Sequence, residues 1–226
     1  RVRVFESGIV MHLKETKIKR GDILMLFNNK TRFVKYLTSI LIGMPIWFVT
    51  GILITFSPEF GRALGLDQPI DAGKAVLFAF AGQVVGNIIS GGLSQYLQSR
   101  KKVIGLFMAG SFLLVLIYLL MPIKQTSWFY ILVAGLGFFS GYWALFITVA
   151  AELFGSNIRA TVATTVPNFV RGTVIPLTAL FVLMKSHVGT LYGALVVGAI
   201  TYLIAMFALF VLEETFKKDI NYTEDV

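Results

Sequence analysis

One basic residue lies inside an apolar stretch of the chain, where a charge is costly. Arg171 stands near the middle of segment 160–184, and the helical period places Thr164, Asn168 and Thr178 on the same face. An arginine at the centre of a bilayer costs about 2.5–3.5 kcal/mol on insertion scales, so such a residue usually lines a cavity or meets a partner. A guanidinium can hold a carboxylate or a phosphate through two hydrogen bonds. This face is therefore predicted to bind an acidic group.

Other polar and aromatic side chains occur at similar depth in the neighbouring apolar segments. Two amides lie one helical turn apart in the second segment, and three aromatic residues lie in the first and fourth segments. Interhelical hydrogen bonding stays open as a role for the amides, and packing stays open for the rings. Arg171 itself could instead pair with a carboxylate outside this chain or with carbonyls freed beside Pro167. The candidate cavity residues are Arg171, Asn168, Thr164, Gln83, Asn87, Trp47, Tyr142 and Trp143.

Six apolar segments must position these side chains. Each is close to the roughly 20 residues that a helix needs to cross a hydrocarbon core of about 30 Å. They are apolar on nearly all faces, which disfavours a soluble helical domain, and they lack the alternation of a membrane barrel. The predicted spans are 36–56, 73–94, 103–121, 128–151, 160–184 and 188–212, between a linker with short helices over 1–35 and a tail over 213–226.

The composition supports an integral membrane protein. Of the 226 residues, 56% are hydrophobic and only 14% are charged, and the mean hydropathy is +0.78. A soluble domain carries about 25% charged residues. The net charge of +8 collects beside the ends of the spans, so nucleic acid is not expected as a partner. The chain has no cysteine, and His12 and His187 lie outside the spans, so we expect neither a metal site nor a cofactor.

The distribution of Lys and Arg predicts the orientation. Fifteen of the 20 fall on one side of the predicted membrane and four on the other, with Arg171 between them. Cytoplasmic loops carry the excess of basic residues, so both termini are predicted to be cytoplasmic, in an inner or plasma membrane. The chain begins with Arg1 and opens on a linker-like segment, so we expect it to be a piece of a longer protein.

The spans also differ in polarity. The first, second, fourth and fifth carry polar side chains, whereas the third and sixth are nearly featureless and are expected to face lipid. This order of two lining helices and one outer helix occurs twice, which indicates a three-plus-three repeat. Two pairs of glycines spaced four residues apart, Gly82 with Gly86 and Gly137 with Gly141, predict close helix packing.

Four loop motifs occur in order, each at a predicted cytoplasmic position. They are FESG at 5–8, GGLSQ followed by SRKK within 91–102, AELF followed by RA within 151–160, and LEETF at 212–216. Together they resemble the corresponding loops in the C-terminal six-helix half of a major facilitator superfamily transporter. Gln95 stands where the second motif usually has Asp, Gly155 stands where the third has Pro, and the first span lacks the glutamines of sugar porters.

The resemblance implies an all-α polytopic membrane fold, in which six transmembrane helices form a three-plus-three inverted repeat as half of a twelve-helix protein. It implies alternating-access transport, in which two halves rock about a site near the midplane. The expected solute is small and polar, an organic anion or a sugar-like metabolite, moved by symport with a coupling proton. The expected partner is the N-terminal six-helix half of the same protein. The expected cytoplasmic gate consists of Glu152, Arg159 and Arg100.

Other functional classes fit less well. No His, Cys, Asp or Glu lies deep inside a span, so a membrane enzyme is not expected, and a carboxylate proton relay would need the other half. A channel would require a charged ring or a re-entrant loop, for which the connections are too short or too polar. The alternatives kept are a six-helix half-transporter that acts as a homodimer, and a channel or structural protein of the membrane.

Overall fold

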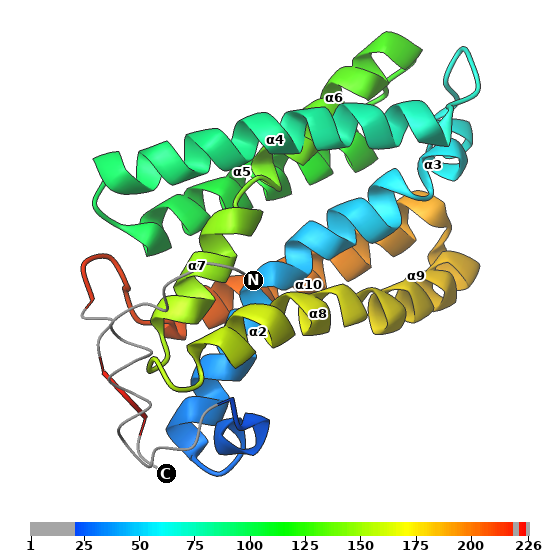
Figure 1. Cartoon of the computed structure of the whole chain (residues 1–226). Coiled ribbons are helices and arrows are strands. Elements are labelled where there is room, and N and C mark those ends of the chain that lie inside the picture. Colours follow the sequence, from blue (N-terminus) through cyan, green and yellow to red (C-terminus); the bar gives the residue numbers. More distant parts are fainter. Residues whose placement is uncertain (1–20, 219–221, 225–226) are drawn as a thin grey trace, which may run out of the picture.

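The computed structural model describes residues 21–218 and 222–224 of the chain (Figure 1). These residues form helices and no strand. The elements are the 3-10 helix η1 (Ile23–Leu26), α2 (Lys30–Phe48), the π-helical segment η2 (Val49–Ile54), α3 (Ser57–Leu64), α4 (Ala72–Tyr96), α5 (Arg100–Leu120), α6 (Thr126–Phe139), α7 (Trp143–Glu152), α8 (Arg159–Gly172), α9 (Val174–Val188) and α10 (Thr190–Val211).

Short polar side chains define where several helices begin. The Oδ1 atom of Asn29 accepts a hydrogen bond from the backbone N–H of Thr31 (2.8 Å) at the start of α2. Asp71 caps α4 in the same way, and Ser99 caps α5. These side chains satisfy backbone donors that have no partner inside the first helical turn. Each cap directly precedes a long apolar run, so local sequence accounts for these boundaries.

The described residues contain six candidate membrane spans by length and composition, which confirms the predicted number. All six predicted ranges overlap them, although most of the helices extend beyond the predicted limits. The spans cover Lys30–Ile54, Ala72–Tyr96, Arg100–Leu120, Thr126–Glu152, Arg159–Val188 and Thr190–Val211. All-α, multi-pass membrane architecture therefore follows from the structure.

Three of the spans are not continuous α-helices. Pro45 lies inside α2 and lacks a backbone N–H, and the helix changes to π-helical hydrogen bonding from Val49 onward. The fourth span is interrupted over 140–142, where α6 ends and α7 begins. The fifth span is interrupted at Thr173, between α8 and α9. Irregular backbone inside a membrane span is tolerated where protein covers it or where it lines a cavity.

The helices form two groups that Figure 1 shows side by side. One group contains α4, α5 and α6; the other contains α2, α8, α9 and α10, and α7 packs against α2 and α8. The backbones of α4 and α6 approach so closely that an added Cβ at Gly82 would lie 2.0 Å from the carbonyl oxygen of Ala134. A Cβ at Gly137 would lie 1.9 Å from that of Ala79. The predicted role of the paired glycines in close packing is confirmed.

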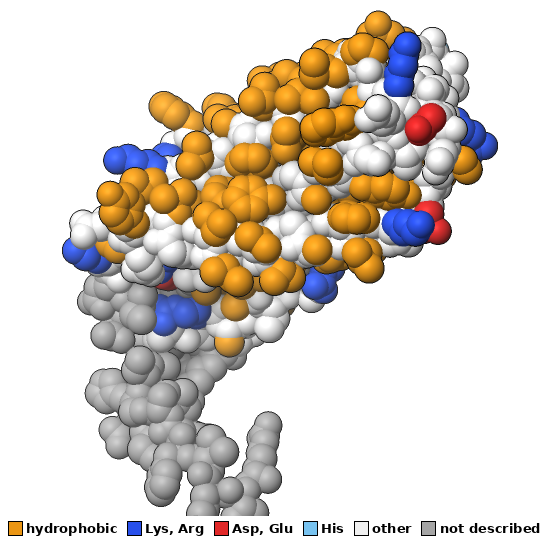
Figure 2. All heavy atoms as spheres, turned by 90° about the horizontal axis from the view of Figure 1, so that it is seen from above, with side chains coloured by type: hydrophobic (Ala, Val, Ile, Leu, Met, Phe, Trp, Pro, Cys, Tyr) orange, Lys and Arg blue, Asp and Glu red, His pale blue; other side chains and the backbone are white. Residues whose placement is uncertain are grey.

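Both ends of the described chain lie at the same end of the bundle, which we call the terminal end. There the N–H of Gly21 donates to the carbonyl oxygen of Asn157, and Lys35 lies 3.6 Å from Glu213. At the opposite end, Lys185 pairs with Glu59. Figure 2 shows hydrophobic side chains across one face of the molecule, with charged side chains gathered toward its ends. This distribution is the one expected of helices that cross a hydrocarbon layer.

The expectation that the third and sixth spans face lipid stays a prediction, because each of these helices has one packed side and one exposed side. The third and sixth spans, α5 and α10, are each 44% buried over their apolar windows, whereas α4 is only 17% buried. The α10 helix packs against α2, α5 and α9, and its Tyr202 hydroxyl meets the hydroxyl of Ser111 inside the bundle. Leu203, Phe207 and Phe210 on α10 are exposed, so this helix also offers the apolar surface that a lipid-facing helix presents.

Candidate functional site

A pocket of about 430 Å³ lies between the two groups of helices. Its walls come from α2 with η2, from α4, from the start of α7 and from the end of α8. Gln83 lies near the midpoint of α4, and Arg171 lies near the midpoint of the span formed by α8 and α9. The pocket is therefore close to mid-depth in the bundle. Its lining residues are Ile46, Trp47, Thr50, Phe80, Gln83, Asn87, Trp143 and Arg171.

In the described part of the chain, the guanidinium of Arg171 is the only charged group that lines this pocket. Its Nη1 atom donates a long hydrogen bond (3.3 Å) to Oδ1 of Asn168, and its Cζ atom lies 5.7 Å from the ring centroid of Trp143. Within residues 21–218 and 222–224 no carboxylate lies within ion-pairing distance of it. The side chain is exposed, so most of its five N–H donors are open to another molecule.

Two tryptophans form an aromatic wall beside the guanidinium. The rings of Trp47 and Trp143 meet edge to face, with centroids 6.3 Å apart. The indole Nε1 of Trp47 is buried and has no hydrogen-bond acceptor in the described part of the chain. A buried donor without a partner costs about 1–3 kcal/mol, so an acceptor is expected to reach it in some state of the protein.

The two amides have different surroundings. The Oδ1 atom of Asn87 accepts a hydrogen bond (3.1 Å) from the backbone N–H of Ala144, in the first turn of α7. Asn87 thus accepts from a backbone N–H that has no partner inside the first turn of α7. Its NH₂ group remains available as a hydrogen-bond donor. Among the described residues, no side-chain hydrogen bond is found for Gln83. Open donors therefore outnumber acceptors in the pocket.

The structure brings together five of the eight side chains predicted from sequence: Trp47, Gln83, Asn87, Trp143 and Arg171. Asn168 and Thr164 lie on the exposed face of α8 but do not line the pocket. The Nδ2 atom of Asn168 donates to the carbonyl oxygen of Thr164, and the Thr164 hydroxyl donates to the carbonyl oxygens of Ala160 and Thr161. Tyr142 does not belong to the site. It is 1% exposed, and its hydroxyl donates to the carbonyl oxygen of Ile42 (3.0 Å).

The sequence offered a signal for one lining residue that the prediction omitted. Phe80 precedes Gln83 by three residues and therefore lies on the same face of α4. By contrast, nothing in the local sequence separates Tyr142 from Trp143. In the structure the interruption over 140–142 turns the first ring into the core and leaves the second on the pocket.

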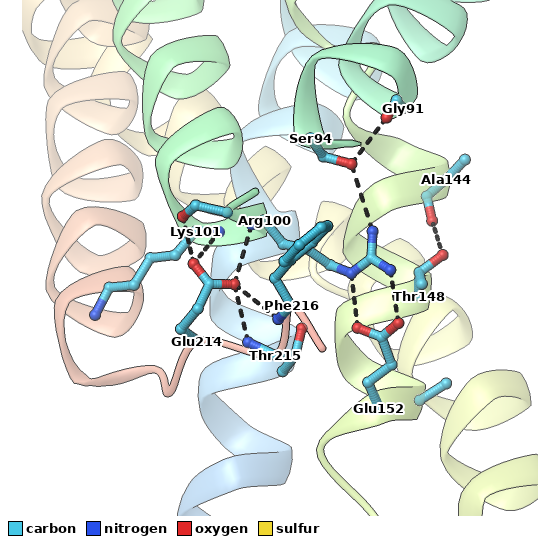
Figure 3. A network of polar contacts seen from close by, with 12 residues as sticks. Gly91, Ser94, Arg100, Lys101, Ala144, Thr148, Glu152, Glu214, Thr215 and Phe216 are labelled. Atoms are coloured by element: carbon cyan, nitrogen blue, oxygen red, sulfur yellow. Dashed lines mark hydrogen bonds and ion pairs between the residues drawn. The ribbon is translucent and has the colours of Figure 1, made fainter. Parts of the chain in front are cut away.

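Two of the predicted gate residues, Arg100 and Glu152, are 52 positions apart in the chain and meet at the terminal end (Figure 3). Arg100, at the start of α5, forms two hydrogen bonds to Glu152 at the end of α7, from Nε (2.7 Å) and from Nη2 (2.8 Å). Its Nη1 reaches the hydroxyl of Ser94 at 3.4 Å. The two charged side chains are only 14% and 18% exposed. This bidentate pair ties α5 to α7 and to the end of α4.

Glu214 adds a second carboxylate to the same network. It accepts hydrogen bonds from the hydroxyl of Ser99 and from the N–H groups of Arg100 and Lys101, which lie at the start of α5. Burial raises the pKa of Glu214, but the hydrogen bonds from Ser99 and from backbone N–H groups outweigh it, so that its pKa lies below the ordinary value. The segment after α10 is therefore held to α5 by an ionised carboxylate.

Arg159, the third predicted gate residue, lies at the start of α8. Its guanidinium donates to the carbonyl oxygens of Ala151 (3.2 Å) and Phe154 (3.1 Å), at and just after the end of α7. These contacts hold the loop between α7 and α8. No group of three His, Asp or Glu side chains that could hold a metal ion occurs among the described residues.

A comparison with protein-family models finds no match, and a comparison with curated proteins finds none either.

Proposed function

We propose that the chain is one half of a secondary transporter of the major facilitator type, and that the Arg171 pocket is one wall of its solute site. The observation that carries the proposal is an arginine at mid-depth, facing a pocket, with no carboxylate partner among the described residues. An intramembrane charge of this kind usually marks a solute or ion pathway. The loop motifs at 91–102 and 151–160 support the family, as do the contacts between them.

The balance of hydrogen-bonding groups favours an organic anion as the solute. Arg171 and the Asn87 NH₂ group both offer donors, whereas the Asn87 oxygen is occupied by the start of α7. No acidic side chain of the described residues lines the pocket, so this part of the chain offers no counter-charge to an amine or a cation. A carboxylate or a phosphate would satisfy the guanidinium through two charge-assisted bonds.

A sugar-like solute is the second candidate. The Trp47 and Trp143 rings provide flat apolar surface beside the amides of Gln83 and Asn87, an arrangement that suits a hydroxyl-rich ring. Uptake measured across a panel of organic acids and neutral sugars would distinguish the two solute classes, because only the first should depend strongly on the charge of residue 171.

The remaining parts of the proposal concern topology and coupling. Of the basic residues in the described chain, nine lie at the terminal end and four at the opposite end, which favours a cytoplasmic terminal end. The N-terminal six-helix half would cover the exposed face of α4 and complete the site. A coupling proton would have to be carried by that half, because no carboxylate of this chain lies deep in a span. The inverted repeat is part of the same proposal.

The test is uptake by the full-length carrier with Arg171→Ala. Loss of a charge-assisted hydrogen bond costs about 1.5–3 kcal/mol, so uptake at low solute concentration should fall more than tenfold. Arg171→Lys keeps the charge without the bidentate geometry and should retain part of the uptake. Lys74→Ala, which removes an exposed charge at the opposite end, is the matched control. Normal uptake by Arg171→Ala, at normal membrane expression, would refute the proposal.

A further inference from the structure

A second concave site lies at the terminal end, on the outside of the bundle. It has a volume of about 270 Å³ and lies between the start of α2, the end of α10 and the end of α7. We call it the α2–α10 groove. One face of α2 supplies most of its polar lining, at spacings of one and four residues. The main lining residues are Lys30, Thr31, Lys35, Thr38, Val211 and Glu213.

The groove carries a surplus of positive charge. Among the described residues Glu213 is the only acidic one that lines the groove, and it is already paired with Lys218 at 3.2 Å as well as with Lys35 at 3.6 Å. The Lys218 and Lys35 contacts hold the pKa of Glu213 below its ordinary value, so its charge is present but compensated. In the described part of the chain, neither the Lys30 ammonium nor the Thr31 hydroxyl has a hydrogen-bond partner. Open donors therefore remain after the internal pairs are formed.

The two helix ends beside the groove add to this surplus. The start of α2 presents the positive end of its dipole. The end of α10 would present a negative one, but the ammonium of Lys101 donates to the carbonyl oxygens of Phe210 (2.7 Å) and Leu212 (2.8 Å). This contact compensates the carbonyl groups that would otherwise repel an anion.

Exposed apolar side chains occur on both helices that form the groove. Leu37 on α2 is 40% exposed, and Val211 and Phe207 on α10 are 46% and 70% exposed. The groove lies where these apolar helices end and the charged loops begin, at the depth of lipid headgroups. A ligand that fits both parts has an anionic head and hydrocarbon chains. Basic pockets between transmembrane helices are recurrent sites for such headgroups.

We propose that the α2–α10 groove binds the phosphate of an anionic phospholipid, with Lys30 and Lys35 as its cationic contacts and the acyl chains along α2 and α10. The proposal requires only that the helices cross a membrane, and it is independent of the transport proposal. A bound lipid there would fix the start of α2 against the end of α10.

The experiment is native mass spectrometry of the full chain in detergent, titrated with phosphatidylglycerol or with phosphatidylcholine of the same acyl chains. The wild-type chain should bind one phosphatidylglycerol at least several-fold more tightly than phosphatidylcholine. In Lys30→Gln/Lys35→Gln, the affinity for phosphatidylglycerol should fall about tenfold or more, because each basic residue contributes separately to anionic headgroup binding. Its affinity for phosphatidylcholine should not change.

The matched control is Lys102→Gln/Lys217→Gln, which removes the same charge from exposed positions at the same end but outside the groove. An equal loss in this control would mean that general surface charge attracts the lipid, and would overturn the proposal. Equal binding of the two lipids by the wild-type chain would also overturn it. Glycerol phosphate that competes at concentrations comparable to those of the lipid would show that a free phosphate compound is the ligand instead. Unchanged melting temperatures in phosphatidylcholine would show that each variant is folded.

Discussion

The crossing of α4 with the α6–α7 region should be highly sensitive to a single methyl group. In Gly86→Ala the new Cβ would lie 2.0 Å from the carbonyl oxygen of Phe138, whereas ordinary contact begins near 3.4 Å. The difference, 3.4 − 2.0, means that the two backbones must separate by about 1.4 Å. The carbonyl oxygen belongs to the backbone, and the position of the Cβ is fixed by the backbone of residue 86. No side-chain rotation can therefore relieve the contact.

The separation would also break hydrogen bonds that cross this contact. The hydroxyl of Ser90 donates to the carbonyl oxygen of Gly141 at 2.7 Å, and Asn87 accepts from Ala144 N–H at 3.1 Å. Overpacking costs about 1–3 kcal/mol, and each lost hydrogen bond costs about 0.5–1.5 kcal/mol. Gly86→Ala should therefore lower the free energy of unfolding by about 2–6 kcal/mol.

The same helix provides a matched control. A Cβ at Gly92 would meet nothing within 4 Å, so Gly92→Ala adds only the helix propensity of alanine, which favours folding by about 0.5–1 kcal/mol. Thermal or detergent-induced unfolding of the two purified variants measures the contrast. Equal stabilities for Gly86→Ala and Gly92→Ala would refute the reasoning, because they would mean that the α4 crossing does not depend on backbone contact.

Three further predictions concern the terminal end and the core. Replacing either Arg100 or Glu152 by Gln should lower the free energy of unfolding by about 1.5–3 kcal/mol. A double-mutant cycle should show that replacing both lowers it by less than the sum of the two single effects. Because the pKa of Glu214 is lower in the folded than in the unfolded chain, its stabilising contribution is complete above the unfolded value of about 4.3 and disappears as the pH falls through the folded value. The free energy of unfolding should therefore fall less steeply in Glu214→Gln than in the wild type as the pH drops below the unfolded value. An identical fall in the two proteins would contradict the assignment. Tyr142→Phe removes a buried hydroxyl bonded to Ile42 and should cost about 0.5–1.5 kcal/mol of stability while leaving relative solute preference unchanged; a changed preference in uptake assays would place Tyr142 in the site after all.

Much of the fold was predictable because its signals are local. Apolar runs of the right length identify six spans, although the helix capped by Asn29 begins at Lys30 and not at the predicted residue 36. The spacing of Gly82 and Gly86 identified a face that a neighbouring helix approaches closely. The stripe around Arg171 followed from the helical period alone. These features need no knowledge of which helices are neighbours.

The tertiary structure decided which faces meet. Glu152 pairs with Arg100, 52 residues away, because the end of α7 lies beside the start of α5 at the terminal end. The oxygen of Asn87 accepts a hydrogen bond from α7 and is not open to the pocket. The pocket therefore offers more hydrogen-bond donors than acceptors. The interruption over 140–142 buries Tyr142 and leaves Trp143 on the pocket. A helical period specifies the direction of each side chain around its own axis, but not the neighbour that lies there, and that choice depends on packing among all six spans.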